Sequence, residues 1–211
     1  MLLVLAGPDG AGKSTQAKFL YDWYSDQGYS VKILDKWDIL NISSNPECRF
    51  INSSLDELRY CISEMKGESR SLFLFWSIFQ TMVDIEDIHD PDTIYISDGY
   101  WIKHAASEVL YGNSEDWVRS VTSAFPKPDY IFYFDIEPSV TSVRKSDFTP
   151  YECGRNTEMK IEQFINHQLS LKSMMDKWSR QDDWVSINAN RDVDDVFHDI
   201  CSYLKLEVEC G

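Results

Sequence analysis

The chain has 211 residues, enough for one domain with a substantial core but cramped for two. Its formal charge of −15 at pH 7 sets up a field that repels polyanions, which disfavours nucleic acid as the main partner. No stretch approaches the roughly 20 consecutive apolar residues of a membrane-spanning helix. The cysteines are scattered without C-x-x-C spacing, which indicates neither a disulfide framework nor a zinc site (Cys48, Cys61, Cys153, Cys201 and Cys210). We therefore expect a soluble protein in a reducing, cytoplasmic setting.

Five short apolar runs, each bounded by turn or cap residues, are predicted as strands: 2–6, 31–35, 93–97, 130–135 and 184–188. Most of these runs are too continuously apolar for a half-exposed antiparallel sheet, so buried parallel strands are expected. Helices are predicted between them, over 13–27, 53–66, 70–85, 114–124, 156–180 and 192–204, with another starting at Pro138. The alternation predicts a doubly wound α/β fold in a single domain, 1–211.

A glycine-rich motif, "GPDGAGKS", follows the first predicted strand and opens the first predicted helix. It matches G-x-x-x-x-G-K-[ST] in the context that this motif requires, which indicates the P-loop NTPase fold and a phosphate site. The backbone N–H groups of the loop and the positive end of the helix would surround phosphate oxygens. Lys13 would reach the β and γ phosphates of ATP, and Ser14 would ligate Mg²⁺. The loop positions expected to contact the nucleotide are Gly7, Gly10, Ala11, Gly12, Lys13 and Ser14.

No arginine lies within this loop, so the cation that stabilises a phosphoryl-transfer transition state must come from elsewhere. The stretch 144–156 contains proline and glycine, has no helical periodicity and is predicted to be a short lid. Arg144 and Arg155 in this stretch are the preferred candidates, because guanidinium groups bind phosphate in bidentate fashion. Ordinary solvent-exposed charges remain the alternative for each.

Carboxylates mark two further positions. Asp9 lies inside the phosphate loop, where it would either bind a sugar hydroxyl of a second substrate or stabilise the loop through nearby N–H groups. Asp98 follows the third predicted strand, at the edge where open parallel sheets bind ligands. It would hold Mg²⁺ through water or act as a base, with Tyr100 in the acceptor pocket, although "SDG" is also good turn chemistry. Asp135 is the alternative carboxylate, and helix capping explains it well.

The segment "SLFLFWSIFQ" places Phe75 and Phe79 on one helical stripe. Such a stripe usually belongs to the core. The aromatic content of this helix nevertheless makes either ring a candidate for stacking on a nucleotide base.

With these motifs, the chain resembles the thymidylate kinase family of nucleoside monophosphate kinases over most of its length. The resemblance is carried by "GPDGAGKST", "SLFLFWSIFQ", "SDGYW", "PDYIFYFDIEPSVTSVRK" and "INANRDVDDVFHDI". It implies five parallel strands, ATP with Mg²⁺, transfer of the γ-phosphoryl group to a nucleoside monophosphate, and a homodimer. Thr15 joins Lys13 and Ser14 at the ATP site by this resemblance, Asn190 and Arg191 would lie beside the adenine, and Ser14 and Asp98 would serve the metal.

Departures from the family pattern concern the acceptor. Gly99 stands where the family has an arginine after the carboxylate, and Phe79 stands where an arginine faces the thymine ring. Lys36 is the first candidate to replace a missing cation, and Arg70 and Lys103 are further candidates. The expected function is therefore an ATP-dependent kinase for dTMP or a related nucleotide. A kinase with another small-molecule or hydroxyl acceptor, and a degenerate nucleotide-binding regulatory module, remain alternatives.

Overall fold

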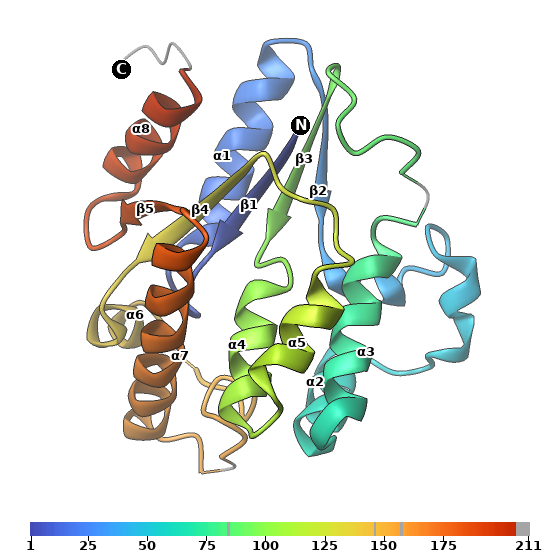
Figure 1. Ribbon diagram of the computed structural model, residues 1–211, viewed down its shortest axis with the longest axis vertical. Helices are drawn as coiled ribbons and strands as arrows, with labels where there is room; N and C mark the ends of the chain where they lie inside the picture. The colour runs from blue at the N-terminus through green and yellow to red at the C-terminus, as the bar shows by residue number, and fades with distance from the viewer. Residues whose placement is uncertain (84, 146, 157, 206–211) are drawn as a thin grey trace.

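The computed structural model describes residues 1–83, 85–145, 147–156 and 158–205, so Cys210 and position 146 of the predicted lid lie outside the described residues. Within these ranges, five parallel strands form one sheet in the order β2-β3-β1-β4-β5 (Figure 1). The strands are β1 (Leu2–Ala6), β2 (Ser30–Leu34), β3 (Thr93–Asp98), β4 (Tyr130–Asp135) and β5 (Val185–Asn188). All five predicted strands are confirmed to within one residue at each end, and with them the α/β fold class.

The helices connect and cover these strands. They are α1 (Lys13–Asp26), α2 (Leu55–Glu64), α3 (Gly67–Gln80), α4 (Ile102–Leu110), α5 (Glu115–Thr122), α6 (Pro138–Arg144), α7 (Ile161–Gln181) and α8 (Val193–Leu204), with short 3-10 helices η1 (Lys36–Leu40) and η2 (Pro46–Phe50). No helix in the described ranges is both long enough and apolar enough to cross a membrane.

The two faces of the sheet carry different helices because side chains along a strand alternate between faces. Leu3 and Leu5 of β1 point to the face covered by α1 and α8. Leu2 and Val4 point to the opposite face, where α3, α4, α5 and α7 pack (Figure 1). The inner strands β1, β3 and β4 are therefore largely buried between two layers of helices, which explains their continuous apolar runs, whereas the edge strand β2 is mostly exposed.

Differences from the predicted helices lie at their ends and between β3 and β4. Helix α3 begins at Gly67 and ends at Gln80 instead of continuing to 85, and α7 begins at Ile161 rather than 156. Helix α4 was not predicted, although Ala105, Ala106 and Val109 give its sequence an apolar face. This helix packs against α7, α3 and α5 and follows directly on the carboxyl end of β3. It therefore brings additional side chains to the edge of the sheet where ligands bind.

Candidate active site

The glycine loop connects β1 to α1 and leaves little room for a side chain at Gly10. Gly10 and Gly12 have φ of +79° and +90°, a left-handed conformation that glycine adopts without steric penalty. A Cβ atom on Gly10 would lie 3.1 Å from Cβ and 3.2 Å from the carbonyl oxygen of Thr141 in α6. The first turn of α1 contains no acidic residue, so the positive end of the helix dipole is open to an anion. The loop thus has the form of a phosphate-binding nest.

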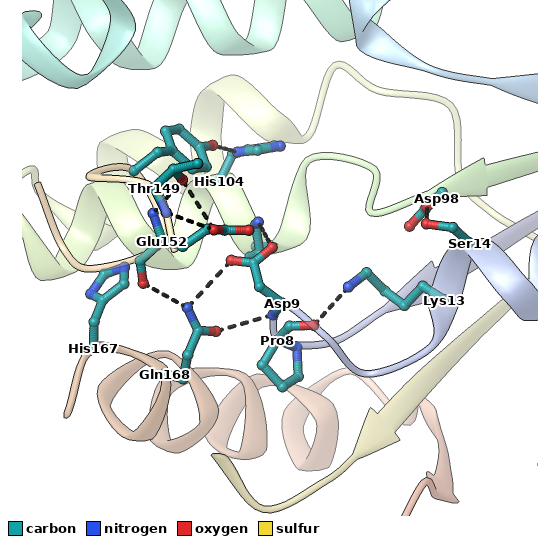
Figure 2. Close-up of polar contacts among 12 residues, drawn as sticks. Pro8, Asp9, Lys13, Ser14, Asp98, His104, Thr149, Glu152, His167 and Gln168 are labelled. Atoms are coloured by element: carbon teal, nitrogen blue, oxygen red, sulfur yellow. Dashed lines mark hydrogen bonds and ion pairs between the residues drawn. The ribbon is translucent and has the colours of Figure 1, made fainter. Parts of the chain in front are cut away.

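Lys13 and Ser14 begin α1; the Lys13 side chain points to Pro8 and the Ser14 side chain to Asp98 (Figure 2). The Lys13 ammonium group donates a hydrogen bond to the carbonyl oxygen of Pro8 at 2.7 Å, within the loop itself. The hydroxyl group of Ser14 donates to the carboxylate of Asp98 at the end of β3. Burial lowers the pKa of Lys13, although the negative charges of Asp98 and Asp9 act in the opposite direction. A phosphate chain would provide this buried cation with a further counter-charge.

The Ser14 hydroxyl and the Asp98 carboxylate are the groups that fit a magnesium ion. Both are hard oxygen ligands, and Mg²⁺ in nucleotide sites usually takes one or two protein oxygens and completes its shell with phosphate and water. No cluster of three or more His, Cys, Asp or Glu side chains suited to a metal exists in the described part of the chain. A site that shares its ion with a bound nucleotide does not require such a cluster.

A cleft of about 1050 Å³ opens over the glycine loop at the carboxyl edge of the sheet. Asp98 lines it near the centre, and the loop residues from Asp9 to Thr15 form its floor. The remaining walls come from both sides of the sheet and from the predicted lid, and they include Lys36, Trp37, Arg59, Lys103, His104, Arg144, Lys145, Tyr151, Glu152 and Arg191. The volume and the many cations favour a large phosphorylated ligand or two ligands side by side.

Asp9 is the centre of a hydrogen-bond network that joins the glycine loop to α4 and α7 (Figure 2). Its carboxylate accepts from the Lys103 ammonium group at 2.6 Å and from the Gln168 side-chain amide at 3.3 Å. The Asp9 backbone N–H in turn donates to the Gln168 side-chain oxygen at 3.1 Å. Gln168 also donates to the carbonyl oxygen of Glu152, which links the loop to the predicted lid.

Charge in this part of the cleft follows from burial and from neighbouring lysines. Burial opposes ionisation of both Asp9 and Lys103. Their mutual attraction, together with that of Lys13 and Lys145 for Asp9 and of Tyr151 and Glu152 for Lys103, outweighs it, so the pKa of Asp9 is lowered and that of Lys103 is raised. Burial, and then the nearby positive charge of Lys103, lower the pKa of Lys36 to about 8. Burial and the surrounding cations lower the pKa of His104 well below its ordinary value, so His104 is neutral at pH 7.

Comparison with known proteins finds similar sequences among the thymidylate kinases. The chain is 28% identical over 214 residues to the probable thymidylate kinase of Thermococcus kodakarensis, covering 97% of each chain. It is 27% identical over 200 residues to the thymidylate kinase of Caenorhabditis elegans, covering 93% of this chain and 86% of that one. The chain is thus similar to thymidylate kinases over nearly its full length. No protein-family model matches it.

Several residues that the motifs and the thymidylate kinase resemblance predicted for the site do line the cleft. They are Asp9, Gly10, Ala11, Gly12, Lys13, Ser14, Thr15, Lys36, Asp98, Arg144 and Arg191. Arg144 donates to the carbonyl oxygens of Ala189 and Arg191 at 3.3 and 3.4 Å, so it is tied to the connection between β5 and α8. Gly7 lies at the start of the loop, where a Cβ atom would meet Phe134 at 3.0 Å.

Phe75 and Phe79, predicted as candidates to stack on a base, and Tyr100, predicted for the acceptor pocket, pack in or against the core and do not line the cleft. Phe75 is 1% exposed, and Phe79 stacks on Phe125 with ring centroids 3.7 Å apart. Tyr100 is 2% exposed and donates to the carbonyl oxygen of Pro126 at 2.8 Å. The rings of Phe75, Phe79 and Tyr100 all contact the ring of Phe125, which lies before β4. Phe125 therefore covers aromatic surface that a ligand would otherwise contact. Tyr100 borders only a cavity of about 10 Å³.

Arg155 and Asn190 also lie away from the cleft wall. Arg155 donates through Nε to the carbonyl oxygen of Ser63 at 2.8 Å and lies over the ring of Tyr111, so it joins the predicted lid to α2. The Asn190 side chain accepts from the N–H of Glu137 at 3.0 Å and donates to nearby oxygens at the ends of β4 and β5. Both side chains contact loop backbone in the structure, and the phosphate and adenine contacts expected of them stay predictions.

Four cleft-facing or network residues escaped the sequence analysis: Trp37, His104, Tyr151 and Gln168. Tyr151 from the predicted lid makes a 2.5 Å hydrogen bond between its hydroxyl and Nδ1 of His104. Gln168 lies mid-way along α7, and nothing in its local sequence distinguishes it from an ordinary helical glutamine. Trp37 could have been noticed, because it follows Lys36 at the end of a predicted strand, where ligands are expected.

Proposed function

We propose that this chain is an ATP-dependent kinase that transfers the γ-phosphoryl group of ATP to a nucleoside monophosphate. The observation that carries the proposal is the combined geometry of the glycine loop, Lys13 and the Ser14–Asp98 pair at one end of the 1050 Å³ cleft. The relatives are named thymidylate kinases or probable thymidylate kinases, which supports the same reaction class. Thymidylate is the first acceptor to test.

In the proposed reaction, an oxygen of the acceptor phosphate forms a bond to the γ-phosphorus while the bond from that phosphorus to the β,γ-bridging oxygen breaks. The bridging electron pair leaves with ADP, and the other product is a nucleoside diphosphate. Lys13 and the N–H groups of the loop stabilise the negative charge on the transferred group and the leaving oxygen. Mg²⁺, when bound with the nucleotide, neutralises part of the phosphate charge, and Ser14 and Asp98 would hold it.

The roles of the other residues follow from their position. Arg144 lines the cleft from the β4 side and is the proposed additional cation for the transition state. Arg191 lies on the same side, where the adenine of ATP is expected. An ionised phosphate acceptor needs no proton removed, so Asp98 serves the metal, and it would become a general base only if the acceptor were an alcohol.

We also propose a cytoplasmic setting and a homodimer, in agreement with the family. The four cysteines in the described ranges, Cys48, Cys61, Cys153 and Cys201, are free thiols, as expected in a reducing compartment.

An acceptor other than thymidylate is a second candidate, and a specific observation favours it. The aromatic ring of Phe79, at the position of the family's base-contacting arginine, is stacked on Phe125 instead of offering a hydrogen bond. Where a site is built around such a bond, losing it costs about 10⁴- to 10⁵-fold in discrimination. The base preference of this chain is therefore expected to differ from that of a thymidylate-specific enzyme.

The test is ATP consumption with Mg²⁺ against a panel of nucleoside 5′-monophosphates and the corresponding nucleosides, with Lys13→Ala as the control. We expect at least one monophosphate to raise turnover well above this control. If none does, the protein is a nucleotide-binding module without kinase activity. If thymidylate is turned over faster than every other monophosphate, the argument from Phe79 is wrong.

Acceptor use is expected to weaken above pH 8, because Lys36 lines the cleft and its pKa is about 8. Above this pH the side chain loses the charge that attracts phosphate, so kcat/KM for the acceptor should fall about tenfold between pH 7 and pH 9. The lowered pKa of Lys36 costs folding free energy at neutral pH. Between pH 8 and 10.5 the unfolded chain binds more protons at Lys36 than the folded chain, so this cost is lost and the stability rises with pH.

Lys36→Arg is the control for this profile, since a guanidinium group stays charged throughout. Its alkaline limb should shift beyond pH 10. The charged groups Asp35, Asp9, Asp98 and Lys103 all influence Lys36 and remain in the variant. An unchanged limb in Lys36→Arg would assign the pH dependence to another group.

A further inference from the structure

Most of the predicted lid lies along one wall of the cleft as a compact unit, residues 147–156, which we call the lid segment. Thr149, Tyr151 and Glu152 of this segment line the cleft. The Glu152 carboxylate accepts from the N–H and hydroxyl groups of Thr149 at 3.0 and 3.1 Å (Figure 2), and it forms an ion pair with Lys145 at 2.9 Å. These contacts lie within or directly before the segment, so they maintain its shape without fixing its place on the protein.

Helix α7 holds the lid segment through two contacts. Its Gln168 side chain donates to the carbonyl oxygen of Glu152 at 3.0 Å and to the Asp9 carboxylate at 3.3 Å, so it lies between the segment and the glycine loop (Figure 2). Phe148 of the segment stacks on Phe164 of the helix, with ring centroids 4.6 Å apart. The segment is therefore fixed relative to the glycine loop as well as to α7.

Helices α2 and α4 also hold the lid segment. Arg155 donates through Nε to the carbonyl oxygen of Ser63, near the end of α2, at 2.8 Å. The Tyr151 hydroxyl group lies 2.5 Å from Nδ1 of His104 in α4. The groups in these contacts with the three helices all belong to this chain. Docking of the lid segment thus follows from the fold itself and does not depend on a phosphate contact.

The contact between Tyr151 and His104 has a defined donor. Burial raises the pKa of Tyr151 to about 12, so the hydroxyl group keeps its proton. His104 is neutral, because burial and the neighbouring cations lower its pKa. A neutral imidazole has one accepting nitrogen, so Tyr151 donates to Nδ1 and the ring proton lies on Nε2. Since His104 is 2% exposed, loss of this donor in the docked state would leave Nδ1 buried without a partner.

Tyr151 is also the anchoring residue best placed to control access to the cleft. The centre of its ring lies 5.3 Å from the Lys103 ammonium group and 5.4 Å from the Arg70 guanidinium group. Tyr151 and His104 both line the cleft, so their hydrogen bond closes part of the cleft wall. Movement of Tyr151 away from His104 would open this wall and separate the ring from the two cations.

We propose that the fold itself docks the lid segment over the cleft, and that the hydrogen bond from Tyr151 to His104 is a latch that opens before a ligand enters or leaves. Tyr151 and His104 are positioning residues in this assignment, because they act through the place of the segment. Passage of ATP through the opening rests on the proposed kinase function. Docking of the segment does not, and it is measured without turnover.

The first test measures trypsin cleavage after Arg155 in the full-length protein without nucleotide. Trypsin needs this arginine released from Ser63, so the cleavage rate follows the fraction of molecules in which the segment is undocked. Docking predicts cleavage at least about tenfold slower than in a peptide with the sequence of residues 147–162. A smaller difference would show that the segment is mostly undocked, which would overturn the proposal.

The second test removes the latch. Tyr151→Phe keeps the ring but leaves Nδ1 of His104 unpaired in the docked state, so cleavage after Arg155 should be about 5- to 100-fold faster than in the wild-type protein. Tyr21→Phe, a matched change at a tyrosine of α1 that is 39% exposed, should not change the rate. The double variant Tyr151→Phe/His104→Leu leaves neither partner unpaired and should be cleaved more slowly than Tyr151→Phe. Equal rates in Tyr151→Phe and Tyr21→Phe, or in Tyr151→Phe and the double variant, would overturn the latch. Cleavage after Lys18 within α1 reports unfolding of the whole chain, and an equal acceleration there would also overturn it.

Ligand passage is measured by stopped-flow binding of ATP with Mg²⁺. Opening of the latch limits both entry and exit, so Tyr151→Phe should raise the association and dissociation rate constants by a similar factor, with Kd changed less than about threefold. Rate constants equal to those of Tyr21→Phe would overturn the role in passage. If ATP does not bind to the wild-type protein, the kinase proposal and the role in passage fail together, while the cleavage rates still decide whether the segment is docked.

Discussion

Replacing Lys13 by alanine is expected to lower kcat for phosphoryl transfer by about 10³-fold, the upper range for removing one preorganised electrostatic contact from a transition state. The ammonium group lies inside the glycine loop, 2.7 Å from the carbonyl oxygen of Pro8, where it meets the developing charge without reorganising. Burial lowers its pKa, so a bound triphosphate supplies charge that the empty site lacks. The measurement is single-turnover transfer at saturating ATP with the best acceptor.

Two controls make this result specific. Lys18→Ala, at an exposed position of the same helix, should retain wild-type kcat. Thermal unfolding with and without ATP should show that Lys13→Ala folds but gains less from the nucleotide, since ligand stabilisation follows its affinity for the native state. Retention of more than about a tenth of wild-type kcat in a folded Lys13→Ala protein would remove Lys13 from the transition-state contacts.

The fold could be predicted well because local patterns determine it. The apolar strand runs are continuous since both faces of the sheet are covered, and the glycine loop identifies the β1–α1 junction. Helix α4 is not predicted because "SDGYW" favours a turn and a ligand pocket at the end of β3. The apolar face that Ala105 and Ala106 give this helix is a weaker signal. The ends of the helices are predicted less well. Helix α3, for example, ends at Gln80 and not at 85, because tertiary contacts rather than local sequence determine where it stops.

The site could be predicted only in part, because its network joins distant segments. The donor side follows from one motif, and its residues line the cleft as expected. Lys103 meets Asp9 across 94 positions of sequence, and no local pattern predicts that contact. The helical spacing of Phe79 fits a base-stacking residue as well as it fits a core residue. In the structure its ring stacks on Phe125, a contact that the local sequence does not predict. Residues whose partners are remote require the structure.

Replacing Glu108 by leucine is expected to destabilise the protein by about 3 to 5 kcal/mol, because it leaves the buried Arg70 guanidinium group without its counter-charge. Both side chains are 1% exposed, and Glu108 also accepts from the Ser71 hydroxyl at 3.0 Å. Arg70 retains the carbonyl oxygen of Ile62 at 3.0 Å, which satisfies one donor but not the charge. For a chain of this size, the melting temperature should fall by about 10 °C or more.

The double variant Arg70→Met/Glu108→Leu distinguishes an ion-pair effect from simple loss of packing. With both charges removed, most of the lost stability should return, because apolar side chains of similar volume commonly replace a buried pair without cost. A double variant as unstable as Glu108→Leu would contradict this explanation. The pair joins α3 to α4, and Lys103 lies on α4 one turn and a half before Glu108. If the pair acts only by holding α4, the double variant should bind the acceptor as the wild-type protein does.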